Sequence, residues 1–275
     1  MNRLQLQDIY TYPIKSLGGI RLDKAKVEEK GLQYDRRWML IDRDGRFLTQ
    51  RKYPEMALLQ TKITDGGISV FDKENPSRQI LVPYDSGSAR YRMVTIWEDR
   101  VEAQIVNSGI SLWFSEVLKI ECELVFMPPS TRRKLQPEYA VNGESVSFAD
   151  GMPYLLIGQS SLDDLNSRLS NPVPMNRFRP NLVFSGGSPF QEDEWDIVTI
   201  GDARFKITKP CARCVVTTVD QQTGEKGREP LTTLSTYRNR DGKVMFGQNM
   251  LLLRGTDISV GDTISFESRS RIKQE

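Results

Sequence analysis

The sequence contains no histidine among its 275 residues, and this absence removes several classes of chemistry. Without imidazole the chain cannot build a Ser-His-Asp or Cys-His nucleophile, a two-histidine iron site or a histidine-ligated zinc. Cysteine is scarce as well, and an odd total of three favours a reducing compartment over a disulfide framework. Three thiols are also too few for a four-thiolate zinc site or a plant-type iron–sulfur cluster within one chain.

The sequence also lacks long apolar runs and a strong excess of either charge. The first thirty residues carry charges throughout, and no segment approaches eighteen consecutive apolar residues. We therefore expect a cytoplasmic protein with no signal peptide and no membrane span. Lys and Arg number 38 against 36 Asp and Glu, which gives no reason to expect a nucleic acid as the main partner.

Short strands separated by turns dominate the first hundred residues. The patterns predict strands at 4–13, 20–26, 37–41, 47–49, 58–63, 67–71, 79–82, 93–97 and 101–106. Asp44-Gly45 predicts a hairpin turn between two of these strands, because it supplies the positive φ that a primed turn needs.

Two helices are predicted before a second β-rich region. Residues 110–118 and 160–169 carry apolar residues at helical spacing, and Ser160 is the predicted N-cap of the second helix. Further strands are predicted at 182–184, 195–200, 203–208, 214–219, 248–253 and 262–266. The chain is therefore expected to be mainly β with a few helices (α+β), in closed or nearly closed barrels. Two packed subdomains and one large β-rich domain both remain reasonable at this length.

Residues 209–214, Lys-Pro-Cys-Ala-Arg-Cys, are the most informative segment, because a thiolate must carry most of the remaining chemistry. As half of a zinc site the pair lacks two further ligands, unless two chains share the metal. A thioredoxin-type dithiol should precede a helix, whereas the Val and Thr residues that follow here favour a strand.

Two interpretations of Cys211 and Cys214 stay open on residue chemistry alone. Cysteines are commonly small buried hydrophobic side chains. Alternatively, one thiolate ligates a soft metal whose cofactor brings the remaining ligands, so that a single protein sulfur is sufficient. Lys209 and Arg213 flank the pair with positive charge, and Pro210 would hold it on a defined turn.

Residues 209–220 resemble the signature of the MOSC family, which is named for the C-terminal domain of molybdenum cofactor sulfurase. Further segments continue the resemblance in the family's order: 12–16, 31–38, 148–150, 176–181, 229–238, 246–249 and 260–262. The sequence is most similar to the branch that contains the mitochondrial amidoxime-reducing component and bacterial proteins that detoxify N-hydroxylated bases. The resemblance covers about residues 10–266.

The resemblance implies an N-terminal β-barrel subdomain packed on a MOSC β-barrel. We expect these subdomains at residues 1–108 and 109–267, followed by a tail at 268–275. Some bacterial relatives carry a C-terminal ferredoxin-like domain that supplies electrons, and we expect that domain to be missing here because the chain ends soon after Phe266. Electrons would then come from a separate protein of the ferredoxin, flavoprotein or cytochrome b5 type.

The resemblance also implies a site for the molybdenum cofactor, in which molybdopterin carries the metal. Cys214 corresponds to the thiolate ligand of molybdenum, and Asp150 is the nearest candidate for a catalytic proton donor. The implied cofactor-binding residues are Lys15, Ser16, Arg36, Asp150, Arg179, Asn181, Arg213 and Cys214. These residue types suit the task, because a phosphate is held by a cation, a hydroxyl donor and a guanidinium.

Three functional hypotheses follow. The first is a molybdenum-dependent reductase, independent of pyridoxal phosphate, that converts N–OH groups of small molecules to N–H with loss of water. The second is a carrier of the molybdenum cofactor or of sulfur that turns over no substrate of its own. The third is a β-barrel adaptor that binds no ligand. The amidoxime-reducing likeness favours the first, whereas the expected lack of an electron-transfer domain favours the second.

Overall fold

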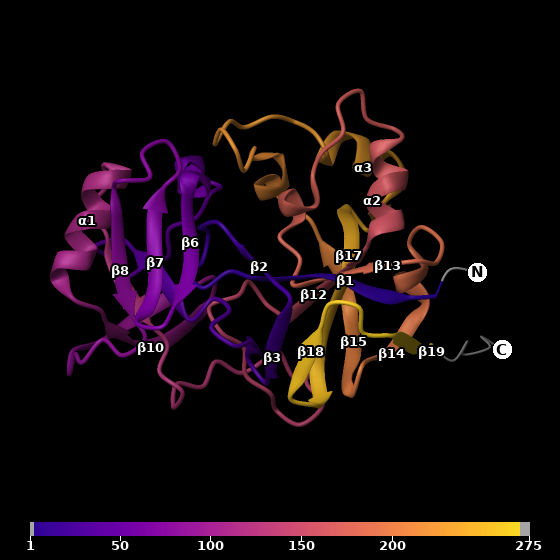
Figure 1. Ribbon diagram of the computed structural model, residues 1–275, viewed down its shortest axis with the longest axis horizontal. Helices are drawn as coiled ribbons and strands as arrows, with labels where there is room; N and C mark the ends of the chain where they lie inside the picture. The colour runs from indigo at the N-terminus through magenta and orange to yellow at the C-terminus, as the bar shows by residue number, and fades with distance from the viewer. Residues whose placement is uncertain (1–2, 270–275) are drawn as a thin grey trace.

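The computed structural model describes residues 3–269 and consists of two lobes, each built around β-sheets (Figure 1). The described part of the chain contains three α-helices: α1 (Ser108–Leu118), α2 (Gln159–Asn166) and α3 (Leu231–Tyr237). The predicted mainly β fold with a few helices is confirmed. Of the predicted tail, residues 270–275 lie outside the described residues. No helix within residues 3–269 has the length and apolar character needed to cross a membrane.

The larger lobe contains a nine-stranded sheet with the order β19-β14-β15-β17-β12-β13-β1-β2, and β16 pairs with β17 at one side. Its strands are β1 (Gln5–Thr11), β2 (Ile20–Leu22), β12 (Tyr154–Gly158), β13 (Leu182–Ser185), β14 (Trp195–Ile200), β15 (Ala203–Ala212), β16 (Asn239–Arg240), β17 (Lys243–Arg254) and β19 (Ile264–Ser268). Neighbouring strands are antiparallel except for β12 and β13, which are parallel.

The first strand closes this sheet into a barrel. The Leu6 amide donates to the Asp262 carbonyl at 2.9 Å, and the Gly261 amide donates to the Leu6 carbonyl at 2.8 Å. A bridge also joins Gln5 to Thr263, next to the start of β19. Because β1 pairs with β13 on its other side, a strand from the beginning of the chain completes a barrel made mostly from its second half.

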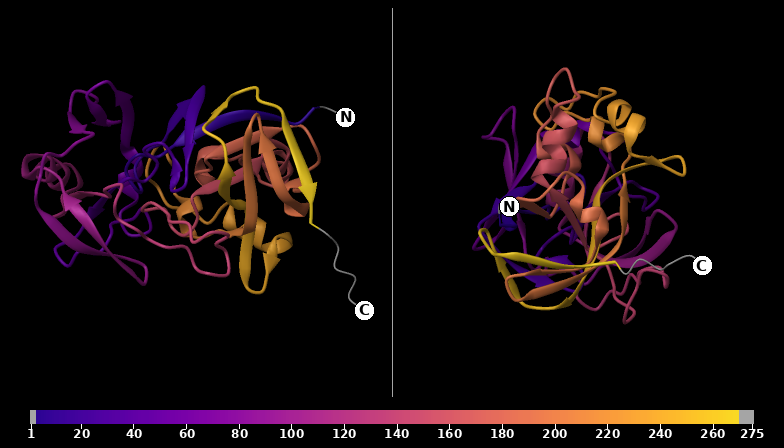
Figure 2. Two further views of the ribbon diagram at one scale, coloured as in Figure 1. Left: turned by 90° about the horizontal axis from the view of Figure 1, so that it is seen from below. Right: turned by 90° about the vertical axis from the view of Figure 1, so that its right-hand side faces the viewer.

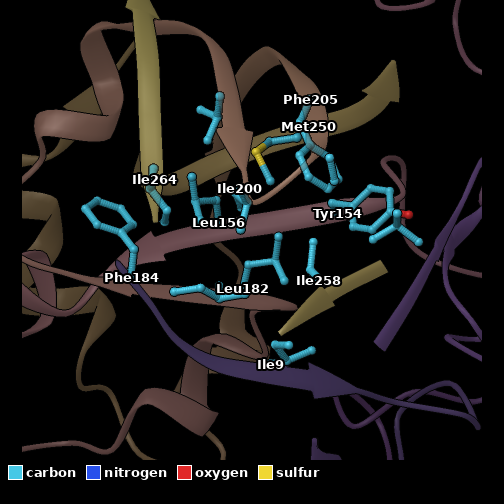
Figure 3. Close-up of a cluster of buried hydrophobic side chains, with 14 of the residues drawn as sticks. Ile9, Tyr154, Leu156, Leu182, Phe184, Ile200, Phe205, Met250, Ile258 and Ile264 are labelled. Atoms are coloured by element: carbon cyan, nitrogen blue, oxygen red, sulfur yellow. The ribbon is translucent and has the colours of Figure 1, made fainter. Parts of the chain in front are cut away.

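Apolar side chains that alternate along these strands fill the barrel (Figure 3). Leu6 and Ile9 of β1 pack with Leu182 and Phe184 of β13, and each of the four is at most 1% exposed. Burying one such side chain stabilises the fold by roughly 1.5–3 kcal/mol. The alternation that predicted strands therefore also supplies the core of the barrel.

Three short strands form a separate sheet beside this barrel: β3 (Lys24–Glu28), β4 (Gly31–Leu32) and β18 (Asp257–Ser259). Ala25 and Val27 of β3 and Ile258 of β18 contribute to the same buried cluster as the barrel strands. Strands β1 to β4 therefore belong to the larger lobe, although they lie in the first 32 residues.

The smaller lobe contains two sheets and α1, and it lies beside the barrel in both views that show the long axis (Figures 1 and 2). One sheet has the order β5-β11-β10-β9, and the other has the order β6-β7-β8. Their bounds are β5 (Trp38–Ile41), β6 (Leu59–Thr64), β7 (Gly67–Asp72), β8 (Gln79–Pro83), β9 (Tyr91–Ile96), β10 (Asp99–Ile105) and β11 (Glu123–Phe126).

Helix α1 covers this lobe and confirms the helix predicted at 110–118. The buried side chains of Ile110, Phe114 and Leu118 are spaced four residues apart, so they share the face that packs on the sheets. The Asn107 side chain accepts the Gly109 amide at 2.7 Å and caps the first turn. The predicted turn at Asp44-Gly45 is also present, with Gly45 at a φ of 78°.

The N-cap prediction for the second helix is wrong. Helix α2 begins at Gln159 after Gly158, and no side chain caps it. The hydroxyl of the predicted cap, Ser160, is buried and has no hydrogen-bond partner within residues 3–269. The next residue, Ser161, donates its hydroxyl to the buried carboxylate of Glu192 at 2.9 Å. The helix begins one residue earlier than predicted, so Ser160 lies inside its first turn and not at its cap.

The prediction of a strand at 214–219 is also wrong. Val215–Thr218 form a 3₁₀ helix, η4, although Val and Thr favour strands. The Thr217 hydroxyl donates to the Cys214 carbonyl at 3.0 Å, and the Thr218 hydroxyl donates to the Val215 carbonyl at 2.8 Å. These local bonds stabilise the turn against the strand preference. Helix α3 was not predicted from the sequence.

Candidate functional site

Residues of both lobes line a cavity of about 510 Å³. Its lining comes from loops of the smaller lobe, from the long connection between β11 and β12, and from the ends of β15 and β17. Among the described residues, its charged lining comprises seven cations and one carboxylate: Lys15, Arg36, Arg51, Arg179, Lys209, Arg213, Lys243 and Asp150. A concave surface with this excess of positive charge attracts an anionic ligand.

A short ion pair lies on one wall of the cavity. The Lys15 ammonium donates to the Asp150 carboxylate at 2.5 Å and to the Phe148 carbonyl at 2.7 Å. Burial lowers the pKa of Lys15 to about 8, although Asp150 opposes this change. Burial acts to raise the pKa of Asp150, but the charge and hydrogen bond of Lys15 outweigh it and hold that pKa well below its usual range. Asp150 is therefore ionised at neutral pH.

A buried arginine positions the segment that carries Asp150. The Arg133 guanidinium donates to the carbonyls of Ser147 at 3.0 Å, Ala149 at 2.5 Å and Asp150 at 3.2 Å. It also pairs with Asp99 at 2.7 Å, which comes from β10 of the smaller lobe. Four acceptors from two parts of the fold thus converge on one side chain that is only 4% exposed.

Two arginines contact the same tyrosine ring on another wall. The guanidinium carbons of Arg36 and Arg179 lie 4.3 and 4.2 Å from the centroid of the Tyr12 ring. Arg36 also pairs with the fully buried carboxylate of Asp35 at 2.7 Å. Burial lowers the pKa of Arg179 to about 10, so this side chain stays charged at neutral pH. Its Nη2 is buried and has no hydrogen-bond partner within residues 3–269.

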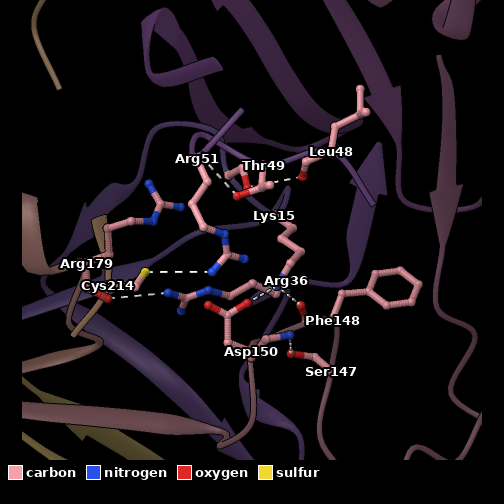
Figure 4. Close-up of polar contacts among 12 residues, drawn as sticks. Lys15, Arg36, Leu48, Thr49, Arg51, Ser147, Phe148, Asp150, Arg179 and Cys214 are labelled. Carbon is pink, nitrogen blue, oxygen red and sulfur yellow. Dashed lines mark hydrogen bonds and ion pairs between the residues drawn. The ribbon is translucent and has the colours of Figure 1, made fainter. Parts of the chain in front are cut away.

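Both cysteines of the predicted pair line the cavity, and each contacts a different arginine (Figure 4 shows Cys214). Arg51 Nη1 lies 3.7 Å from Cys214 Sγ, and Arg213 Nη1 lies 2.9 Å from Cys211 Sγ. Both thiols are free and half-buried. Neither is therefore a fully buried hydrophobic side chain, whereas Cys122 is.

The structure brings all eight predicted cofactor-binding residues to this cavity. Their roles stay predictions, and two contacts refine them. The Ser16 hydroxyl donates to the Leu48 carbonyl at 3.4 Å. The Asn181 side chain accepts from the Leu155 amide and donates to the Tyr10 carbonyl, both at 3.2 Å, so it ties β1 to β12.

The cavity is also lined by Arg51, Tyr139 and Lys243, which were not predicted from the sequence. Arg51 follows a predicted strand, and no local pattern distinguishes it from a solvated arginine. It reaches Cys214 across 163 positions of the chain. Tyr139 lies under the Lys209 ammonium, 3.4 Å from its ring centroid, in a long connection without regular structure. Only the tertiary structure shows these contacts.

The fold and the site define a two-lobed, β-barrel protein with a cationic, thiol-containing cavity. The MOSC domain family matches residues 143–265, and the MOSC N-terminal beta barrel domain matches residues 3–121. Mitochondrial amidoxime-reducing component 1 of Mus musculus is 32% identical over 93% of this chain and 80% of its own length. The human protein of that name is 31% identical over 93% of this chain and 81% of its own length. The chain belongs to the MOSC family, which confirms the predicted resemblance.

Molybdenum cofactor sulfurases are relatives as well. The protein of that name from Oryza sativa subsp. japonica is 34% identical over 97% of this chain, but the match covers 34% of its own length. The chain thus spans about a third of the plant sulfurases that it matches. The likeness to solved structures is lower: the YUAD protein of Bacillus subtilis is 10% identical over 97% of both chains, with a TM-score of 0.43.

Proposed function

We propose that this chain binds the molybdenum cofactor in the cavity, with Cys214 as the thiolate ligand of molybdenum, and reduces N-hydroxylated small molecules. One observation carries this proposal: the Cys214 sulfur, seven cations and a single carboxylate line the same cavity of about 510 Å³. The similarity to amidoxime-reducing components over four fifths of their length supports the same reaction class.

The residues of the cavity fit an anionic cofactor. An unpartnered buried donor costs about 1–3 kcal/mol, and the Nη2 of Arg179 is such a donor. A phosphate or pterin oxygen that accepts from it would remove this cost. We assign Lys15, Ser16, Arg36 and Arg179 to the phosphate and pterin, since they supply the cations, hydroxyl and guanidinium forks that such groups require.

Three other residues take supporting parts in this proposal. Asn181 uses its side chain to join β1 to β12, so we assign it to positioning the wall of the cavity. Arg213 adds positive charge beside Cys211. Asp150 is ionised at neutral pH, so it is a poor proton donor, and we assign it to orienting Lys15 and accepting from the pterin amino group.

The reaction consumes two electrons and two protons: the N–O bond breaks, an N–H bond forms and the oxygen leaves as water. When bound, the cofactor supplies the two-electron redox centre. The chain contributes orientation, positive charge around the site and a ligating sulfur. The protons come from solvent that reaches the open cavity, and the electrons come from a separate redox protein.

Metal analysis and turnover test this proposal together. Protein purified from a host that makes the cofactor should contain molybdenum, and it should reduce benzamidoxime with a chemical electron donor. Cys214→Ser should lower turnover more than a hundredfold, because it removes the proposed ligand. Cys122→Ser is the matched control, since this thiol is buried in the smaller lobe, and it should leave turnover within twofold.

The sulfurase match supports a second candidate, a carrier of the cofactor or of sulfur. Bound molybdenum without turnover of benzamidoxime in the wild type would favour the carrier. If neither molybdenum nor pterin copurifies from a competent host, the reductase and the cofactor carrier both fail. A persulfide on Cys214, detected by mass spectrometry, would then favour the sulfur carrier, and its absence would leave the ligand-free adaptor.

A further inference from the structure

Trp97 is an exposed aromatic side chain close to the cavity. It lies in the two-residue turn between β9 and β10 and is 47% exposed. Its φ of 56° is unusual for a bulky residue, because that region is sterically costly without glycine. Tyr91 and Met93 of β9 are 50% and 48% exposed, and their alternation places them on one face of that strand. Three large apolar side chains are thus exposed within seven residues of one hairpin, and exposed apolar side chains that gather in one region mark interaction surfaces.

The indole of Trp97 connects to the proposed metal ligand through one side chain. The Arg51 guanidinium carbon lies 4.2 Å from the Trp97 ring centroid, and Arg51 Nη1 lies 3.7 Å from Cys214 Sγ. Figure 4 shows the Arg51 guanidinium reaching toward this sulfur. The Lys226 ammonium donates to the Arg51 carbonyl at 2.7 Å and fixes its backbone. Two non-covalent contacts thus lead from the surface to the sulfur.

Four exposed cations lie on the segments next to Trp97, Phe47 and Arg51. Arg43 and Arg46 lie in the turn that precedes Phe47, whose ring centroid is 5.4 Å from that of Trp97. Arg100 of β10 stands directly across from Thr95 of β9. Lys52 follows Arg51 in the chain.

The charges of this surface leave an excess of positive charge. Within residues 3–269, Arg43, Arg46, Lys52 and Arg100 are exposed and make no ion pair with a carboxylate. The exposed carboxylates of the two turns and of the neighbouring part of β10 are Asp44, Glu98, Asp99 and Glu102, of which Asp99 pairs with Arg133. The cationic cavity behind this surface adds to the same field, which attracts an acidic protein surface.

We propose that Trp97 and these four cations form the docking surface for an acidic one-electron carrier protein, and that electrons enter through Trp97 and Arg51. This inference rests on the proposed function, since only a redox centre beside Cys214 needs electrons. Two reduced carriers dock in turn, each is oxidised by one electron, and with two protons the N–OH group becomes N–H and water. Redox encounters use small, charge-steered contacts, for which Trp and Arg are the favoured central residues.

The test compares a charge reversal at this surface with one elsewhere. Arg43→Glu with Arg46→Glu removes two of the proposed docking cations. Lys26→Glu with Arg254→Glu is the matched control, since both residues are exposed and Arg254 lies five positions from the cavity-lining Asn249, roughly 17 Å along β17. Binding of purified plant-type ferredoxin, flavodoxin and soluble cytochrome b5 is measured by calorimetry at low and at high salt.

We expect at least one of these acidic carriers to bind, with an affinity that the docking variant lowers at least tenfold and the control changes less than twofold. The difference should shrink as salt rises, because exposed charges are screened. Trp97→Ala should slow reduction of the protein by the saturating carrier at least tenfold. The docking variant should reduce benzamidoxime normally with a chemical donor, since its two residues do not line the cavity.

Two outcomes overturn this docking surface. One is a carrier that supports turnover and binds the docking variant as tightly as the wild type. The other is binding by none of the three carriers while the chemical donor still drives turnover. Loss of turnover with the chemical donor in the wild type overturns the proposed function instead, so the two failures are distinguishable.

Discussion

At the scale of single residues, several of the positive charges in the cavity each contact a carboxylate or an aromatic ring. Lys15 has Asp150, Arg36 has Asp35, and Tyr12 lies against two guanidinium groups. Each partner offsets part of the repulsion and of the desolvation that burial imposes. The charge of Arg179 is less well compensated, because its Nη2 has no hydrogen-bond partner within residues 3–269. Burial therefore lowers the pKa of Arg179.

Arg133→Met should destabilise the protein by about 2–4 kcal/mol, because it removes an ion pair and leaves buried carbonyls at residues 147–150 without their donor. Urea unfolding measures this change. Arg132→Met is the matched control: Arg132 is 54% exposed and pairs with Glu29 at 3.3 Å on the surface, so its loss should cost less than about 0.5 kcal/mol. Equal losses in the two variants would contradict a structural role for Arg133.

Some site residues were predictable from the sequence, and others were not. Cys214, Lys15 and Arg36 stand in motifs that are recognisable locally, so the resemblance identified them. Arg51 contacts Cys214 only because the turn that carries it folds back over a segment 163 positions away. Nothing local encodes such a contact.

At the scale of secondary-structure elements, β15 and η4 decide where the two thiols lie. Cys211 is still part of β15, whereas Cys214 precedes the first residue of η4. The break between strand and 3₁₀ helix falls within the Cys-x-x-Cys segment, so the sulfurs contact different arginines. The strand predicted from Val and Thr missed this break, because threonine hydroxyls bond back to the chain and stabilise the turn.

Gly247→Ala tests how closely β17 approaches β12. Gly247 has a φ of 81°, and a Cβ there would lie 2.9 Å from the Leu156 carbonyl oxygen and 2.6 Å from Ile157 Cγ1. We expect a loss of at least about 2 kcal/mol from the backbone strain and the clash together. Thermal and urea unfolding give the value.

Gly242→Ala is the control for Gly247→Ala. Gly242 has a similar φ of 73°, but no heavy atom lies within 4 Å of the position that a Cβ would take there. The loss there should be about 1 kcal/mol, from backbone strain alone. If both substitutions cost the same, close packing of β17 on β12 is not the reason for the glycine.

At the scale of the whole molecule, the cavity depends on a chain that crosses between the lobes. Residues 5–32 pair in the larger lobe, after which the chain builds most of the smaller lobe and returns at β12. The loop between β1 and β2 carries Lys15 to the smaller lobe, where the Lys15 amide donates to the Trp38 carbonyl at 2.8 Å. Arg36 lies on the segment that leaves the larger lobe, and Asp150 lies on the segment that returns to it. The site is therefore made where the two lobes meet, and neither lobe contains all of it.

Residues 122–275 alone should therefore fail to form a stable barrel. They lack β1, whose Leu6 and Ile9 side chains are buried against Leu182 and Phe184, and they leave β13 without its antiparallel neighbour. Circular dichroism during urea unfolding should show no cooperative transition for this fragment. Co-expression with residues 1–121 should restore one. A cooperative transition in the fragment by itself would show that β1 is dispensable.

The sequence by itself determined the class of fold, the family and the residues whose chemistry is local: the missing histidines, the alternation of the strands and the motif around Cys214. These follow from composition and from short-range patterns, which act within a few residues of the chain. Only the tertiary structure decided that Arg51 meets Cys214, that Arg133 holds the Asp150 segment and that Trp97 stands beside the cavity. Such contacts join positions far apart in the chain, and they form because packing of the two lobes brings those positions together.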